Sequence, residues 1–274
     1  MDTIDTHTPA PDAGPRPSAL WRQVAVPSEH GGWSLTAEPV VLGLIVAWSW
    51  PGLALGLAAM LAFVARTPLK VVLVDRWRRR WLDRSRLAAR IGTVELIAIA
   101  ALGVWAASAA AGGWFWVPLA MAAPLIGIEL WFDMRSRSRR LVPELAGTIG
   151  IGSIVAAIVL ASGESTTLAL GLWVVVSARA AAAIPYARTQ VFRAHGRPVT
   201  RWHNDLAQGS AVTATVAAWS LAAIPGAPVL AVAAIAVFNI AAVRGPVKRA
   251  VVIGIQQMTF GIAVVAVTAI AVLT

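Results

Sequence analysis

Two pairs of polar side chains lie within apolar stretches of the sequence, at spacings that could build one binding site. Arg66 and Lys70 are four residues apart, which puts both on one face of a helix. Two cations so close repel each other, which is tolerable if a bound anion lies between them or if Asp75, further along the chain, pairs with one of them. Alternatively, both are topological charges at the cytoplasmic end of their segment. Arg179 and Tyr186 are seven residues apart and also share a helical face. A guanidinium beside a phenol suits a carboxylate or another anionic head group.

Arg179 has two interpretations. It precedes Arg188 by nine residues, which corresponds to about 13 Å along a helix. An arginine this deep in an apolar segment needs an ion-pair partner or a water-filled cavity. It therefore either binds an anionic ligand or forms a structural ion pair with Glu144 or Glu38. Glu144 opens its own apolar segment, where a carboxylate also complements the helix dipole.

The stretch VPSEHGGW, residues 26–33, leads into the first apolar segment. Its two glycines allow the backbone to bend, and its tryptophan suits an anchor at the level of the lipid head groups. We expect an interfacial or re-entrant segment that turns Glu29 and His30 toward a polar cavity. His30 would be the group there that titrates near neutral pH. Gln256, one turn into the last apolar segment, adds an amide.

The elements that must position these residues are membrane-spanning helices. Of the 274 residues, 58% are hydrophobic and 13% are charged, about half of the roughly 25% charged residues in a soluble domain. A spanning helix needs about 20 apolar residues. The sequence predicts an all-α polytopic membrane protein with about nine transmembrane helices. The apolar segments cover residues 34–50, 52–65 (or 52–74), 91–111, 114–132, 141–162, 168–187, 206–224, 229–243 and 251–273.

The basic residues predict how these segments are oriented. Every lysine and arginine except Arg179 precedes the first segment or falls in alternate connections, and the other connections contain none. The positive-inside rule then predicts a cytoplasmic N-terminus and a C-terminus outside. The net charge of +10 faces anionic membrane lipids, which are expected partners, whereas nucleic acid is not. Residues 1–25 read as a disordered cytoplasmic tail, and residues 26–274 as one transmembrane domain.

Several kinds of chemistry are excluded. The chain has no cysteine, and it contains no HExxH, catalytic triad, P-loop or dinucleotide fingerprint. The sequence predicts no metal site and no cofactor. Ionisable groups within the segments gather toward the cytoplasmic side, which predicts a polar cavity open to the cytoplasm. Glu95, Glu129 and Asp133 are interpreted alternatively as side chains that snorkel to the interface.

Four stretches carry a family resemblance: VPSEHGGW, ARTPLKVVLVDR, LVPELAG and VRGPVKRAVVIGIQQM. Together they resemble the YwiC-like family of bacterial integral membrane proteins, over nearly the whole chain past the tail. The resemblance implies a bacterial cell membrane but no particular activity. A weaker, architectural resemblance is to the UbiA superfamily of membrane prenyltransferases, which hold Mg²⁺ and a prenyl diphosphate with Asp-rich motifs. Asp75, Asp83 and Asp205 do not form that pattern here, so this metal chemistry is not expected.

The first hypothesis is a protein that binds or transports an anionic amphipathic small molecule or lipid. The alternative is a UbiA-like membrane enzyme acting on an isoprenoid or lipid anion without the Asp-rich motifs, and a third is a structural subunit. No catalytic residue is assigned, and whether the protein is an enzyme stays open. The predicted ligand-binding residues are Glu29, His30, Arg66, Lys70, Glu144, Arg179, Tyr186 and Gln256.

Overall fold

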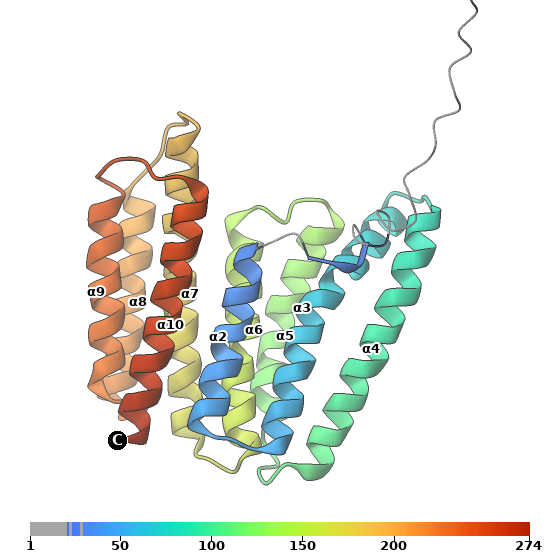
Figure 1. Ribbon diagram of the computed structural model, residues 1–274, viewed down its shortest axis with the longest axis horizontal. Helices are drawn as coiled ribbons and strands as arrows, with labels where there is room; N and C mark the ends of the chain where they lie inside the picture. Colours follow the sequence, from blue (N-terminus) through green and yellow to red (C-terminus); the bar gives the residue numbers. More distant parts are fainter. Residues whose placement is uncertain (1–20, 22–23, 28–29) are drawn as a thin grey trace, which may run out of the picture.

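A computed structural model describes residues 21, 24–27 and 30–274, with the backbone alone for His30. Within residues 30–274 the chain forms nine α-helices and no strand, which confirms the all-α class. Each helix corresponds to one of the nine apolar segments. The helices are α2 (His30–Val46), α3 (Trp50–Trp77), α4 (Asp83–Ala109), α5 (Trp116–Met134), α6 (Leu141–Ala161), α7 (Thr166–Ala194), α8 (Trp202–Ser220), α9 (Gly226–Ala242) and α10 (Ala250–Leu273) (Figure 1).

Length and composition make this a membrane protein. Among the described residues, six helices are long and apolar enough to cross a membrane: α3, α4, α5, α6, α7 and α10. Two further apolar helices, Gly31–Val46 and Gly226–Ala242, are shorter. The second segment takes the longer of its two expected forms, because α3 continues through Pro68 to Trp77.

Local sequence signals set where these helices begin and end. The Ser49 hydroxyl accepts a hydrogen bond from the Gly52 amide at 3.0 Å, and Pro51 opens the first turn of α3. Arg79 and Ser136 end α3 and α5 with positive φ angles of 52° and 55°. Residues in this left-handed conformation commonly close a helix, so these turns are sharp and hold their arginine-rich neighbours close to the helix ends.

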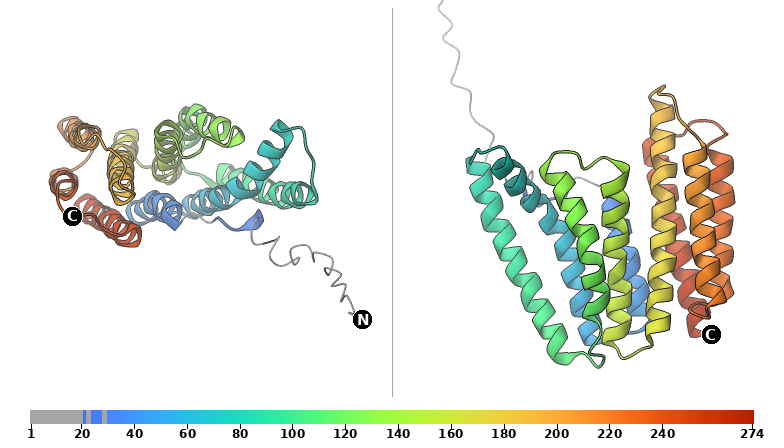
Figure 2. Two further views of the ribbon diagram at one scale, coloured as in Figure 1. Left: turned by 90° about the horizontal axis from the view of Figure 1, so that it is seen from above. Right: turned by 180° about the vertical axis from the view of Figure 1, so that it is seen from behind.

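The helices form a flattened bundle of two layers, seen from above in Figure 2. One layer runs through α10, α2, α3 and α4, and the other through α7, α6 and α5. At one end α8 and α9 join the layers, because α8 packs on α7 and α9 on α10. At the other end α4 packs extensively only against α3 within the described residues. The bundle is therefore closed at one end and open between α4 and α5 at the other.

Helix α6 lies at the centre of the bundle and packs against α2, α3, α5 and α7. All of its residues from Ile154 to Ala161 are buried. Glycines on α3 allow close approach: a Cβ on Gly52 would lie 2.9 Å from Ile158 Cγ2, and one on Gly56 2.7 Å from Val40 Cγ1. Small residues at such contacts are the usual means of packing helices in lipid.

The first turn of α2 corrects one expectation. Gly31, Gly32 and Trp33 are helical rather than a bend. Gly32 faces Phe63, where a Cβ would come within 2.5 Å of the ring, and the Trp33 ring meets the same phenylalanine edge-on at 5.0 Å. Glycine is thus used here for close packing on α3. Glu29 lies outside the described residues, as does most of the expected tail; at the end of that tail Val24 and Ala25 are helical and buried.

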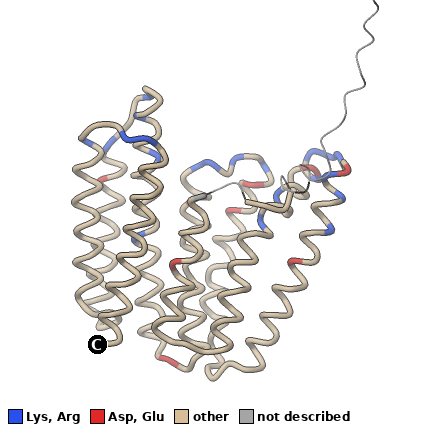
Figure 3. Tube along the Cα trace, in the orientation of Figure 1, with Lys and Arg blue, Asp and Glu red and all other residues tan. Residues whose placement is uncertain are grey.

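Lysine and arginine gather at one end of the bundle, and the C-terminus lies at the other (Figure 3). The four connections at the C-terminal end, residues 47–49, 110–115, 162–165 and 221–225, contain no lysine or arginine. The alternation read from the sequence is therefore reproduced by the arrangement of the helices.

Candidate functional site

A cavity of about 520 Å³ lies between the two layers near the open end of the bundle. Helices α2 to α6 and the connection between α5 and α6 supply all of its lining except Ile184 of α7. Much of the wall is apolar, while one part is polar and charged. The apolar wall includes Leu35, Phe63, Leu96, Ile99, Ile126 and Ile151, and the polar part includes Arg66, Glu129, Ser138, Arg139 and Glu144.

Arg66 is held at the cavity by two carboxylates of α5. Its guanidinium lies 2.8 Å from Glu129 and 2.9 Å from Asp133. Lys70, one turn along α3, lies 3.3 Å from Asp133 and donates to the Ser138 hydroxyl at 2.9 Å. The Asp133 side chain is fully buried. The anion between the two cations is therefore a carboxylate of the protein, which removes their mutual repulsion.

Glu129 has its place because the facing residue is glycine. A Cβ on Gly147 of α6 would overlap the Glu129 carboxylate. The side chain of Glu129 is only 14% exposed, and it lines the cavity. Any larger residue at position 147 would displace this carboxylate from Arg66.

Glu144 forms the second ion pair of the cavity, with Arg188 of α7 at 2.9 Å. The same guanidinium donates to the carbonyl oxygen of Arg139, also at 2.9 Å. The Arg139 side chain lines the cavity and is exposed. Among the described residues no acidic partner of the Arg139 guanidinium is found. Arg139 is thus the cavity cation that is most available to an incoming anion.

A separate charged pair lies deeper, where α2, α7 and α10 meet. Arg179 is 3.0 Å from Glu38, and both side chains are buried, at 3% and 8% exposure. Arg179 also donates to the backbone carbonyl of Gln257, while Ser34 donates to Glu38 at 2.6 Å. The Arg179 Nε and the Gln257 Oε1 are buried without a partner within the described residues. Of the two carboxylates that the sequence offered to Arg179, Glu38 is the partner.

Tyr186 and Gln256 belong to a buried polar network between α7 and α10. Gln256 donates to the Tyr186 hydroxyl at 3.1 Å and accepts from Lys248 at 3.1 Å. Tyr186 is fully buried. A neighbouring row of amides joins α8, α9 and α10, in which Asn239 donates to Gln208 and accepts from Gln257, both at 3.3 Å. Such buried amides hold helices together.

At the surface beside this network, Arg244 follows α9 and donates to Asp205 at 2.6 Å and 3.1 Å. This hydrogen bonding raises the pKa of the Arg244 guanidinium above its ordinary value. The link between α8 and the end of α9 is therefore charged at any physiological pH.

The eight predicted ligand-binding residues do not form one site. Arg66 and Glu144 line the cavity, and Lys70 is bonded to its lining residue Ser138. Arg179, Tyr186 and Gln256 are in the α7–α10 region and do not line it. His30 begins α2 beside the lining residues Gly31 and Gly32, but its side chain and Glu29 lie outside what the structure describes.

Three residues were not predicted as part of a ligand site: Glu129 and Arg139, which line the cavity, and Asp133, which pairs with the lining residue Arg66. Snorkelling to the interface was one of the two interpretations of Glu129 and Asp133; in the structure they are paired with Arg66 and Lys70. A signal was present, because Glu129 and Asp133 repeat the four-residue spacing of Arg66 and Lys70 with the opposite charge. Two helices with complementary spacings can pair both charges at once.

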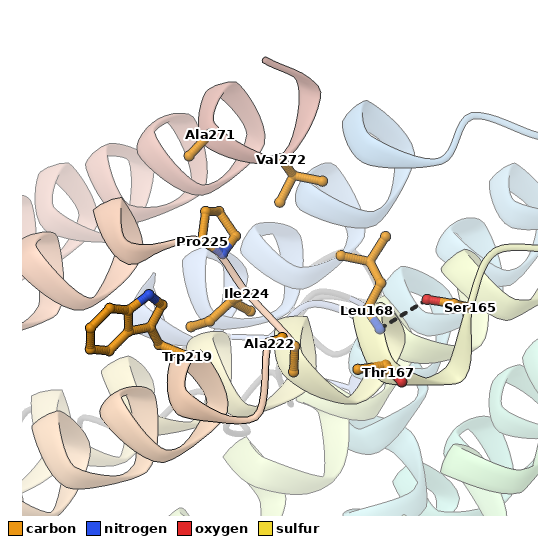
Figure 4. A pocket seen from close by; sticks show the side chains of 10 residues that line it. Ser165, Thr167, Leu168, Trp219, Ala222, Ile224, Pro225, Ala271 and Val272 are labelled. Atoms are coloured by element: carbon orange, nitrogen blue, oxygen red, sulfur yellow. Dashed lines mark hydrogen bonds between the residues drawn. The ribbon is translucent and has the colours of Figure 1, made fainter.

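Metal binding and a second pocket were considered as further candidate sites within the described residues. In the described part of the chain, no group of three or more His, Asp or Glu side chains lies close enough together to hold a metal ion. A shallow pocket of about 500 Å³ at the C-terminal end lies between α7, the α8–α9 turn and α10 (Figure 4). Its lining is mostly apolar, and its Ser165 hydroxyl already accepts from the Leu168 amide at 3.2 Å.

Comparison with protein families gives one match. Residues 26–159 match the family model described as YwiC-like protein. Comparison with curated proteins and with solved structures finds no match. The matched region ends in α6 and contains every lining residue of the cavity except Ile184. The resemblance seen in the sequence motifs is confirmed over residues 26–159, the part of the chain that is similar to the YwiC-like family.

Proposed function

We propose that this membrane protein binds an amphipathic molecule with an anionic head group in the cavity between its two layers. The observation that carries the proposal is the composition of the cavity wall, which is apolar along most of its surface and charged at one part. Cavities of about this volume are typical of small-molecule sites. A ligand with an apolar tail and a polar head would satisfy both parts of the wall.

The available charge favours an anionic head group. Arg66 and Lys70 are already neutralised by Glu129 and Asp133, and Arg188 by Glu144. Arg139 has no such carboxylate among the described residues, so it would be the first contact of an anion. A head group that reaches further would compete with Glu129 for Arg66, since a guanidinium binds carboxylates and phosphates in the same bidentate way.

The open end of the bundle supports access from the bilayer. Leu96 and Ile99 of α4 line the cavity together with Ile126 and Leu130 of α5. Helix α4 packs extensively only on α3 within the described residues, so few contacts would have to break for a tail to pass between α4 and α5. A ligand resident in the membrane could therefore reach the cavity without crossing water.

The same proposal includes an orientation. The charged part of the cavity includes residues 138 and 139 of the α5–α6 connection, which lies at the end where lysine and arginine gather (Figure 3). By the positive-inside rule, that end would face the cytoplasm when the protein lies in a bacterial cell membrane. The head group would then be bound at the cytoplasmic side.

The enzymatic alternative has less support. A UbiA-like prenyl transfer needs carboxylates free to hold Mg²⁺. Asp75 is instead fully buried and bound by Arg80 and Arg84, each at 2.9 Å. No feature of the cavity favours a particular reaction over simple binding.

Two probes with the same tail test the proposal. Oleate and oleyl alcohol differ in the charge of the head group, and each is added to the protein in detergent while its thermal unfolding is followed. Oleate is expected to raise the melting temperature by several degrees and oleyl alcohol by much less, because ligand binding stabilises the folded state. The Arg139→Gln variant should lose most of the oleate effect.

Two tryptophan substitutions on α4 locate the binding site. Ile99→Trp fills the cavity and should abolish the oleate effect, whereas Val104→Trp, on the same helix at a position that is 71% exposed, should preserve it. Equal stabilisation by oleate and oleyl alcohol would show that no anionic head group is recognised. An oleate effect that survives Ile99→Trp would place the binding elsewhere.

A further inference from the structure

A second concave surface lies outside the cavity, at the arginine-rich end of α3 and α5. It has a volume of about 570 Å³ and is lined by Leu73, Arg76, Trp77, Arg79 and Met134. We refer to these five residues as the basic pocket. They come from the last turns of α3, the turn that follows it and the last residue of α5. The pocket thus lies at the level where two apolar helices end.

The two guanidinium groups of the basic pocket are available. Arg76 and Arg79 are exposed, and among the described residues neither has an ion-pair partner. The acidic side chains nearest to them in the chain are engaged elsewhere. Asp75 binds Arg80 and Arg84, and Asp83 lies 3.4 Å from Arg86. The pocket therefore carries a positive charge that the described residues do not compensate.

Within the basic pocket, Trp77 is held in place by an aromatic contact and a cation–π contact. Trp77 meets Trp131 edge-on at 6.4 Å between ring centroids. The Arg135 guanidinium lies over both rings, 4.1 Å from the centroid of Trp131 and 5.4 Å from that of Trp77. A cation over an indole is stabilised by the electron density of the ring. This arrangement fixes Trp77 and adds a third guanidinium beside the pocket.

We propose that the basic pocket binds the phosphate head group of an anionic phospholipid. The Arg76 and Arg79 guanidinium groups would bind the phosphate, since arginine forms paired hydrogen bonds with phosphate oxygens. Leu73, Trp77 and Met134 offer an apolar surface for the adjoining part of an acyl chain. A free phosphate ion would use the guanidinium groups alone, so the mixed lining favours a lipid. This site is independent of the cavity ligand proposed above.

Native mass spectrometry of the protein from mixed micelles tests the site. The protein is incubated with equal amounts of phosphatidylglycerol and phosphatidylcholine, and the retained lipids are counted. The wild type is expected to retain phosphatidylglycerol in preference. Arg76→Gln with Arg79→Gln should weaken that binding about 30-fold, because each basic group near the membrane surface contributes roughly a factor of five. Glutamine keeps a long polar side chain and the backbone preferences at position 79.

The matched control removes two charges at the same end of the bundle but outside the pocket. Arg90→Gln with Arg137→Gln lowers the net charge equally at two exposed positions and should leave the preference unchanged. If both double variants lost the preference for phosphatidylglycerol equally, the preference would come from general surface charge, and the proposed site would be overturned. Equal retention of the two lipids by the wild type would also overturn it, as would displacement of phosphatidylglycerol by millimolar inorganic phosphate.

If the double variant does not fold, the single variants Arg76→Gln and Arg79→Gln decide the question. Each should bind phosphatidylglycerol about fivefold more weakly, because each removes the contribution of one basic group. A single variant that folds and retains the lipid like the wild type would exclude that arginine from the site. Retention by both single variants would overturn the proposal.

Discussion

At the scale of single residues, Arg179 and Glu38 show what an ion pair requires in an apolar interior. Both side chains are buried and 3.0 Å apart, so neither charge can be solvated by water if its partner is removed. The Glu144–Arg188 pair is the natural comparison, because its side chains are 31% and 27% exposed. Partly exposed pairs contribute little to stability, whereas breaking a buried pair is costly.

We predict that Arg179→Gln and Glu38→Gln each lower the free energy of unfolding by about 3–5 kcal/mol, because each leaves a bare buried charge. The double variant should recover much of this loss. Glu144→Gln should cost about 1 kcal/mol or less. Melting temperatures in detergent compare the two single variants, their double variant and Glu144→Gln. When Arg179→Gln is combined with Glu144→Gln, the two losses of stability should add. A recovery of stability in that combination would contradict the pairing of Arg179 with Glu38.

A second residue-scale prediction concerns the glycine against which Glu38 lies. A Cβ on Gly261 would overlap the Glu38 carboxylate, so Gly261→Ala should cost about 1–3 kcal/mol, as overpacking usually does. Gly254 is on the same helix with open space around it, and Gly254→Ala should be neutral or stabilising by up to about 1 kcal/mol, because alanine favours helix. Thermal unfolding compares the two, and equal melting temperatures would count against this close contact.

At the scale of elements, the α3–α4 hairpin is closed by one buried carboxylate. Asp75 is fully buried, and besides Arg80 and Arg84 it accepts from the Ser85 hydroxyl at 2.7 Å. Since α4 packs extensively only on α3 in the part of the chain that the structure describes, this cluster and the contacts between the two helices fix the position of α4. Asp83, by contrast, is 93% exposed, and its one ion pair among the described residues is with Arg86, at 3.4 Å.

We therefore predict that Asp75→Asn loosens the α3–α4 turn without unfolding the bundle. Trypsin should cleave after the arginines within residues 76–86 about tenfold faster. This rate corresponds to a loss of local stability of about 1.4 kcal/mol, because buried hydrogen bonds are weakened. Asp83→Asn serves as the control and should be cleaved at the wild-type rate. The idea would be wrong if the two variants were digested equally fast.

At the scale of the whole molecule, charge and packing divide the bundle in different ways. Lysine and arginine mark one end (Figure 3), which concerns orientation in the membrane. Helices α2–α6 build almost the whole cavity, whereas the row of buried amides joins α8, α9 and α10. Among the described residues, two ion pairs join α2–α6 to α7–α10, and both use arginines of α7, Arg179 and Arg188. The family match covers only the half with the cavity.

The orientation gives the prediction at this scale. Alkaline phosphatase fused after Thr274 should be active, because that enzyme works outside the cytoplasm, whereas a fluorescent protein inserted between residues 78 and 82 should be fluorescent. The reason is that connections at the C-terminal end contain no lysine or arginine. An inactive phosphatase at Thr274 with a fluorescent fusion at the same position would contradict the orientation and require a different number of spans.

The sequence by itself determined the features that depend on neighbouring residues. Long apolar runs predicted the nine helices, and the pattern of basic residues predicted which ends lie together, because hydrophobic length and flanking charge are local properties. The YwiC-like resemblance was likewise readable from short motifs. The bend expected at the two glycines of residues 31 and 32 was wrong, because Gly32 serves a contact with Phe63, a residue some thirty positions away.

Only the tertiary structure decided which charges meet. Arg66 finds its carboxylates on α5 and Arg179 finds Glu38 on α2, and in each case several acids at similar depth were available in the sequence. The choice depends on which helices are neighbours and on their relative rotation, and these follow from how the whole bundle packs rather than from any one segment. For the same reason the cavity was predicted as a single polar site but is built from α2 to α6, with Arg179 and Tyr186 buried elsewhere.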